Sequence, residues 1–209
     1  MPDESRPSEA SAGDPMTVAE FEEELVQALS DELRYWRRRL ASDLIRGFNL
    51  GCYPWFGYLE LSFLTANEED SIPPRVDQGH GGPIFPEFEC YEGLATWRWF
   101  GFQATWDQKW PRGRNLLEWL RWLSSQPESR APISNHALWR LCARAVNSPR
   151  VREELSAYNL APEFVCSVFD PDDCLLENYC LMELRNGPPS ELLQIAERAD
   201  KAFSGIFDQ

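Results

Sequence analysis

The spacing of apolar residues changes near Gly47, and this change limits the fold more than any other feature of the sequence. Before it, apolar side chains recur every three or four positions, which predicts one long amphipathic helix over residues 17–44. Thr17 and Glu20 form a capping box at its start. After Gly47 the interval is two residues, which predicts a β-hairpin with its turn at residues 53–57. The apolar positions of the two strands are Phe48, Leu50, Cys52, Leu59, Leu61 and Phe63.

A tryptophan-rich stretch follows at residues 97–110. Trp97 and Trp99 alternate with other large side chains, which is the two-residue period of a strand covered on both faces. We therefore expect both tryptophans to be largely buried. A stacking platform for nucleic-acid bases is disfavoured, because such platforms carry interleaved Lys and Arg, and only Arg98 and Lys109 are basic here.

Helical patterns dominate the rest of the chain. The expected helices begin after Pro111, at Ser134 or Asn135, at Ser148-Pro149 and at Ser190. The run EFVCSVFD, residues 163–170, predicts a strand between the last two of these helices. Together the elements indicate an α+β fold, in which helices flank a mixed or antiparallel sheet.

The first 16 residues differ in composition from everything that follows. They are rich in Ser, Pro, Gly and acidic residues, which predicts a disordered tail, and residues 17–209 fit the size of a single domain. The tail has neither the basic n-region nor the apolar run of a signal peptide, and no apolar run in the chain reaches the length of a membrane span. We therefore expect a cytoplasmic protein that has no contact with a membrane.

The chain is strongly acidic, with 34 acidic and 20 basic side chains and a net charge of −14. Nucleic acids and anionic membranes both bind through clusters of basic residues, so neither is an expected partner. A basic protein would be attracted instead. The same net charge would also arise if it served only to keep the protein in solution. Nothing in the sequence indicates an oligomeric state.

The sequence lacks the pattern of a metal or cofactor site. Its six cysteines include no C-x-x-C pair, and His80 and His136 lie far from any cysteine pair at zinc-finger spacing. In a reducing compartment we expect six free thiols, which are usually buried. The acidic run at residues 170–177 has Leu175 where an EF-hand requires glycine, so a solvated turn is expected there. We therefore expect no bound metal and no cofactor.

An enzymatic alternative depends on His80, which lies in the glycine-rich run GHGGP near several carboxylates. This run is similar to the oxyanion-forming glycine motif of esterases, but the chain contains no G-x-S-x-G nucleophile elbow. A thiol dyad of His80 with Cys52 or Cys90 has no motif to support it. The alternative that stays open is a hydrolase that uses His80 with nearby carboxylates.

Residues 66–93, which we call the acidic segment, form the longest stretch without a sustained apolar period. They contain seven carboxylates, one arginine and four prolines. Long loops without a pattern are commonly functional or disordered, and we expect this one to bind a partner. Its carboxylates would speed association with a basic protein, and its apolar side chains would provide anchors. The predicted partner-binding residues are Glu68, Glu69, Asp70, Asp77, Phe85, Phe88 and Tyr91.

Two runs of the chain carry a resemblance to known proteins: FNLGCYPWFGYLELSFLTANEE and VREELSAYNLAPEFVCSVFDPDD. With the capped N-terminal helix, they resemble an uncharacterised family of bacterial single-domain proteins of unknown function. Asn67, Glu68 and Glu69 match an A-N-T-E-E-like turn of that family, with Thr65 and Ala66 in place of its usual lead-in. Small acidic proteins of similar appearance include immunity proteins that neutralise bacterial toxins. By this analogy we expect a non-enzymatic protein-binding domain that neutralises a cationic toxin.

Overall fold

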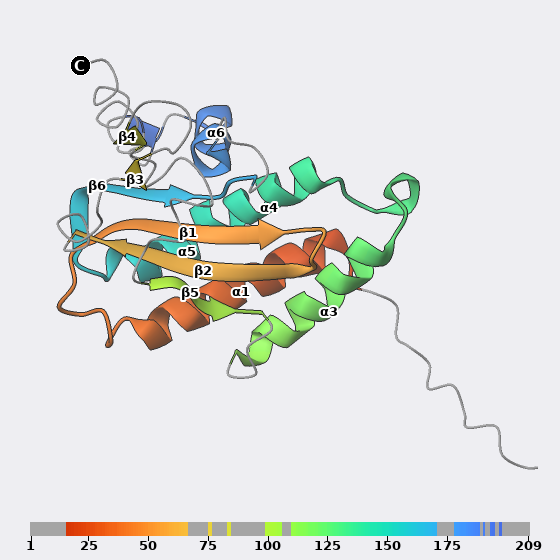
Figure 1. Ribbon diagram of the computed structural model, residues 1–209, viewed down its shortest axis with the longest axis horizontal. Helices are drawn as coiled ribbons and strands as arrows, with labels where there is room; N and C mark the ends of the chain where they lie inside the picture. The colour runs from red at the N-terminus through yellow and green to blue at the C-terminus, as the bar shows by residue number, and fades with distance from the viewer. Residues whose placement is uncertain are drawn as a thin grey trace, which may run out of the picture.

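A four-stranded mixed sheet lies at the centre of the protein (Figure 1). The computed structural model describes residues 16–66, 75–76, 83–84, 99–105, 110–170, 178–188, 190, 193–194 and 197. The strands of the sheet are β1 (Ile45–Tyr53), β2 (Tyr58–Thr65), β5 (Trp99–Ala104) and β6 (Leu160–Ser167). Their order is β5–β2–β1–β6. β2 pairs antiparallel with both β1 and β5, whereas β1 and β6 run parallel.

Helices flank this sheet, which confirms the predicted α+β class. The described helices are α1 (Val18–Trp36), α3 (Pro111–Ser125), α4 (Asn135–Asn147), α5 (Pro149–Ser156), α6 (Tyr179–Asn186) and the short 3₁₀ helix η2 (Glu128–Arg130). As Figure 1 shows, α1, α4 and α5 lie behind the sheet. Two short strands, β3 (Arg75–Val76) and β4 (Pro83–Ile84), pair with each other in a separate sheet. None of the described helices is long and apolar enough to cross a membrane.

α1 begins as predicted but ends earlier. The capping box at Thr17 and Glu20 is formed in both directions, side chain to backbone. The helix stops at Trp36 because the chain must turn there to enter β1 at Ile45. The turn still buries Leu40 completely, so a regular apolar spacing continues beyond the end of the helix. The prediction of one helix over residues 17–44 was therefore too long.

β1 and β2 form the predicted hairpin with the predicted apolar face. The paired residues of that face are Phe48 with Phe63, Leu50 with Leu61 and Cys52 with Leu59, and all six are fully buried. The ring centroid of Phe63 lies 5.1 Å from that of Phe48 and 5.2 Å from that of Phe102 in β5. It also lies 5.3 Å from that of Tyr158, between α5 and β6. One ring therefore joins three strands to the helical layer.

The later elements agree with the sequence apart from two differences. Ser134 caps α4 and Ser148 caps α5, as predicted. β6 starts at Leu160 rather than at residue 163, because the strand extends along its parallel neighbour β1. α6 lies outside the predicted elements, since its eight residues make too few turns to show a helical period. Of the predicted closing helix, the described residues 193–194 and 197 are helical.

Trp99 is partly buried, less than the sequence predicts, and Trp97 lies outside the described residues. The Trp99 ring packs against the core, with its centroid 6.1 Å from that of Trp36. Among the described strands β5 stands at one end of the order, so it has a neighbouring strand on one edge only. Where the structure describes it, the tryptophan-rich stretch thus packs against the core.

The cysteines that the structure describes are free, as predicted. They are Cys52, Cys142, Cys166 and Cys180, and all four are buried. Burial raises the pKa of the Cys52, Cys166 and Cys180 thiols, so these side chains stay protonated at neutral pH. Cys90, Cys174 and the predicted tail at residues 1–15 lie outside the described residues.

Gly57→Ala tests the geometry of the hairpin turn. Gly57 has a φ of 66°, and a Cβ there would lie 3.1 Å from backbone atoms of Arg121 in α3. We expect the free energy of unfolding to fall by about 1–2 kcal/mol, because left-handed backbone costs an alanine about this much. Gly187→Ala is the control, since a Cβ there would make only an ordinary contact at 3.5 Å. Urea unfolding measures the free energy of unfolding of both variants. Equal values for Gly57→Ala and Gly187→Ala would contradict the predicted strain.

Candidate functional site

The acidic segment lies almost entirely outside the described residues. This holds for every predicted partner-binding residue: Glu68, Glu69, Asp70, Asp77, Phe85, Phe88 and Tyr91. It also holds for His80, so the hydrolase alternative stays a prediction. The structure does describe the two strands that flank the acidic segment in the sequence. β2 ends at Thr65, and the sheet resumes at Trp99 in β5, the antiparallel neighbour of β2.

The described residues contain a different polar group, on the second face of the β1–β2 hairpin. Side chains alternate along a strand, so the residues between the apolar positions share this face. We call them the polar face; they pair as Asn49 with Ser62, Gly51 with Glu60 and Tyr53 with Tyr58. A face of this composition normally contacts water. Here Asn49 is 1 % exposed, Glu60 3 % and Ser62 0 %, so the polar face is an internal layer.

Glu60 is the titratable group at the centre of the polar face. The Tyr53 hydroxyl donates a hydrogen bond to Glu60 Oε1 at 2.6 Å. Burial raises the pKa of the Glu60 carboxyl, and the hydrogen bond from Tyr53 offsets only part of this rise. A carboxyl with a raised pKa keeps its proton to higher pH.

Two glycines make room for Glu60. A Cβ at Gly51 would lie 2.8 Å from Glu60 Cγ, which is closer than side chains pack. A Cβ at Gly101 would lie 3.3 Å from Glu60 Oε2, and Gly101 has a φ of 53°, which favours glycine. The Gly101 amide also donates to the Ser62 hydroxyl at 3.0 Å. The strands on either side of β2 therefore present backbone rather than side chains to the carboxyl.

Polar contacts extend from the hairpin to β6. The side chains of Asn49 and Ser167 form a hydrogen bond at 2.9 Å, and Ser167 is 1 % exposed. With its amide oxygen turned toward Gly51, Asn49 also accepts from the Gly51 amide at 3.2 Å. All four strands thus contribute to one internal hydrogen-bonded layer. Within the described ranges, no group of three or more His, Cys, Asp or Glu residues could hold a metal ion.

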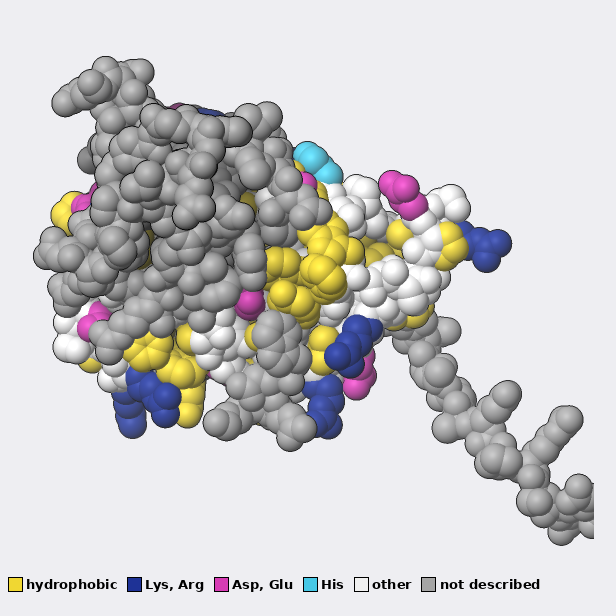
Figure 2. All heavy atoms as spheres, viewed as in Figure 1, with side chains coloured by type: hydrophobic (Ala, Val, Ile, Leu, Met, Phe, Trp, Pro, Cys, Tyr) yellow, Lys and Arg dark blue, Asp and Glu magenta, His cyan; other side chains and the backbone are white. Residues whose placement is uncertain are grey.

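A run of aromatic rings leads from the polar face to the outside of the hairpin turn. The ring centroids of Tyr53 and Tyr58 lie 4.5 Å apart, and those of Tyr58 and Phe56 lie 6.2 Å apart. Phe56 is 67 % exposed and its neighbour Trp55 is 37 % exposed. We call Trp55 and Phe56 the aromatic tip. Figure 2 shows hydrophobic side chains gathered at this end of the hairpin, beside α3 and α4.

The aromatic tip is held against the helical layer. Its turn is closed by the Gly57 amide, which donates to the Tyr53 carbonyl at 2.9 Å. The indole of Trp139 in α4 donates to the Cys52 carbonyl at 3.1 Å, and its centroid lies 6.1 Å from that of Trp55. A surface fixed in this way loses little conformational entropy when it binds.

Comparison with known proteins gave no match. No protein-family model matches the sequence, and no curated protein and no solved structure matches it either. The resemblance of the helix and hairpin to a bacterial family of unknown function therefore stays a prediction. Function must be inferred from the side chains that the structure describes.

The sequence contains signals for both the polar face and the aromatic tip, although no function was predicted for either of them. Asn49, Gly51, Glu60 and Ser62 form the second alternating set of the hairpin, and this set is polar or small. The same pattern is typical of a solvent face, so the period alone does not reveal that the face is buried. The signal for the aromatic tip is the turn YPWFG, in which aromatic residues stand where turns usually carry polar ones.

Glu60→Gln tests the state of the buried carboxyl. Because folding raises the pKa of Glu60, its contribution to stability is fully present below the unfolded-state pKa and is lost as pH rises through the folded-state pKa. We expect wild type to lose stability relative to Glu60→Gln as pH rises from about 4, near the ordinary glutamate pKa. Glutamine keeps an oxygen that accepts from Tyr53. Urea unfolding at several pH values measures the difference, and a constant difference would show that Glu60 has an ordinary pKa.

Proposed function

We propose that this chain is a non-enzymatic domain that binds a basic protein, with the aromatic tip as its apolar anchor. The observation that carries the proposal is the exposure of Trp55 and Phe56. Among the described residues, the large hydrophobic side chains that are exposed are Tyr35, Trp55 and Phe56, and two of the three are adjacent at one turn. Aromatic residues that protrude from a rigid support are typical of the side chains that dominate binding energy at interfaces.

The net charge of −14 selects the kind of partner. Negative charge speeds the approach of a basic protein and disfavours acidic ones, whereas affinity comes from a few desolvated anchors. In this proposal the acidic segment speeds association, and the aromatic tip provides the affinity. Neutralisation of a cationic toxin requires both, because the inhibitor must arrive quickly and leave slowly.

The two surfaces are separated along the hairpin. The aromatic tip precedes Tyr58 at the start of β2, and the acidic segment follows Thr65 at the end of the same strand. At a rise of about 3.3 Å per residue, the two ends of β2 are about 23 Å apart. An interface of standard size covers about 800 Å² on each partner, which is wide enough to include both ends.

Phe56→Ala tests the aromatic tip. A photo-crosslinking residue at position 56 in the native host identifies the protein that contacts the tip, and that protein is then purified and titrated. We expect Phe56→Ala and Trp55→Ala each to cost about 2 kcal/mol of binding, an affinity loss of about thirtyfold. Tyr35→Ala is the matched control, since Tyr35 is 63 % exposed on α1. Equal losses for the tip and control variants would refute the role of the tip.

Replacement of Glu68, Glu69, Asp70 and Asp77 by their amides tests the acidic segment. We expect association with the same partner to slow at low salt and to depend less on ionic strength, because the removed charges act at long range. Dissociation and folding should change little. Stopped-flow mixing measures the association rate. An unchanged rate would show that the segment is only a connection, even if the aromatic tip still anchors the partner.

A further inference from the structure

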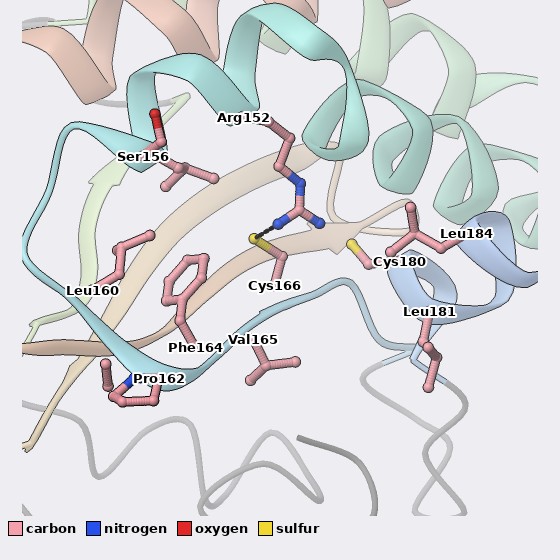
Figure 3. Close-up of a pocket in the computed structure, with 12 residues that line it drawn as sticks. Arg152, Ser156, Leu160, Pro162, Phe164, Val165, Cys166, Cys180, Leu181 and Leu184 are labelled. Atoms are coloured by element: carbon pink, nitrogen blue, oxygen red, sulfur yellow. Dashed lines mark hydrogen bonds between the residues drawn. The ribbon is translucent and has the colours of Figure 1, made fainter. Parts of the chain in front are cut away.

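A cavity of about 260 Å³ lies between β6, α5 and α6, apart from the polar face and the aromatic tip (Figure 3). Most of its walls are apolar. They are formed by Leu155 in α5, Leu160, Phe164 and Val165 in β6, and Leu184 in α6. Such cavities, with few polar groups in an apolar wall, are the usual form of small-molecule sites.

Arg152 in α5 is the charged residue of this lining. One terminal nitrogen of its guanidinium, Nη1, donates to the Cys166 sulfur at 3.0 Å, as Figure 3 shows. The other, Nη2, donates to the side-chain oxygen of Asn147. Its Nε atom is buried and has no hydrogen-bond partner among the described residues. A thiol is a weak acceptor, so the described partners of the cation compensate its charge poorly.

Arg152 also lacks a carboxylate partner within the described part of the chain, although acidic residues outnumber basic ones. The contrast with other arginines is clear. Those that pair with Glu or Asp include Arg34, Arg46, Arg112, Arg140 and Arg144. A guanidinium that lines an apolar cavity, and that has no counter-charge among the described residues, is suited to receive an anion from outside the chain.

We propose that this cavity binds a small monocarboxylate with an apolar tail, whose carboxylate faces Arg152. A single guanidinium matches a single negative charge, whereas a phosphate would require further donors that the apolar walls do not supply. At the volume of about 30 Å³ that a water molecule occupies, the cavity holds about nine non-hydrogen atoms. Acids of six to eight carbons have this size. The inference is independent of the proposed function, because the cavity shares no lining residue with the aromatic tip.

Calorimetric titration of the full chain with hexanoate, hexan-1-ol and hexylamine tests the charge requirement. The three probes have the same tail and carry a negative, a neutral and a positive head group. We expect hexanoate to bind at least about tenfold more tightly than hexan-1-ol, a difference in line with a charge-assisted hydrogen bond, and hexylamine to bind most weakly. Equal affinities, or no binding of hexanoate at millimolar concentration, would overturn the proposal.

Two variants assign the binding to the cavity. Arg152→Met should reduce hexanoate affinity to that of hexan-1-ol, whereas Arg150→Met, which removes the same charge from an exposed position of α5, should leave it unchanged. Val165→Phe places a larger side chain in the cavity and should weaken both hexanoate and hexan-1-ol. Circular dichroism checks that each variant is folded. Full hexanoate binding by folded Arg152→Met or by Val165→Phe would refute the site. If Arg152→Met does not fold, the proposal is tested by Val165→Phe and by the affinity ranking of the three probes for the wild type.

Discussion

The contacts of Phe63 are the interaction on which the arrangement of the other elements depends. This ring packs between Phe48 of β1 and Phe102 of β5, and it also contacts Tyr158 ahead of β6. The Tyr158 hydroxyl in turn donates to the carbonyl of Leu33 in α1. Elements that are far apart in the chain therefore meet around one fully buried side chain.

The opposite face of the β1–β2 hairpin, the polar face, is also buried but is not apolar. Its buried side chains are polar, and each buried polar group needs a hydrogen-bond partner to offset the loss of water. Tyr53 meets this need for Glu60, and Ser167 meets it for Asn49. A carboxyl in such a layer lowers stability when it is ionised, whereas an apolar side chain would not. Departures of this kind from the best packing are common at functional sites, which makes this buried layer a feature of interest besides the aromatic tip.

Local patterns predicted the local structure well. The capping box at Thr17, the apolar face of the hairpin and the caps at Ser134 and Ser148 all follow from residues close together in the sequence. The end of α1 was misplaced because the turn after Trp36 buries Leu40 at helical spacing. The candidate sites were not predictable in this way. A period of two shows which residues share a face, but whether that face is covered, or whether Arg152 meets a carboxylate, depends on segments distant in the chain.

In the sequence, the acidic segment lies between β2 and β5, which are neighbouring strands of the sheet. Phe63 pairs with Trp99, so the chain leaves the sheet and returns to it at adjacent positions. Loop closure over residues 66–98 costs only about 2 kcal/mol more than closure of a tight turn, because each doubling of length adds about 0.6 kcal/mol. A change in the length of this stretch therefore costs little folding free energy, and the sheet can stay constant while the length varies. By this physical argument, relatives of the chain would be expected to vary in length mainly between β2 and β5.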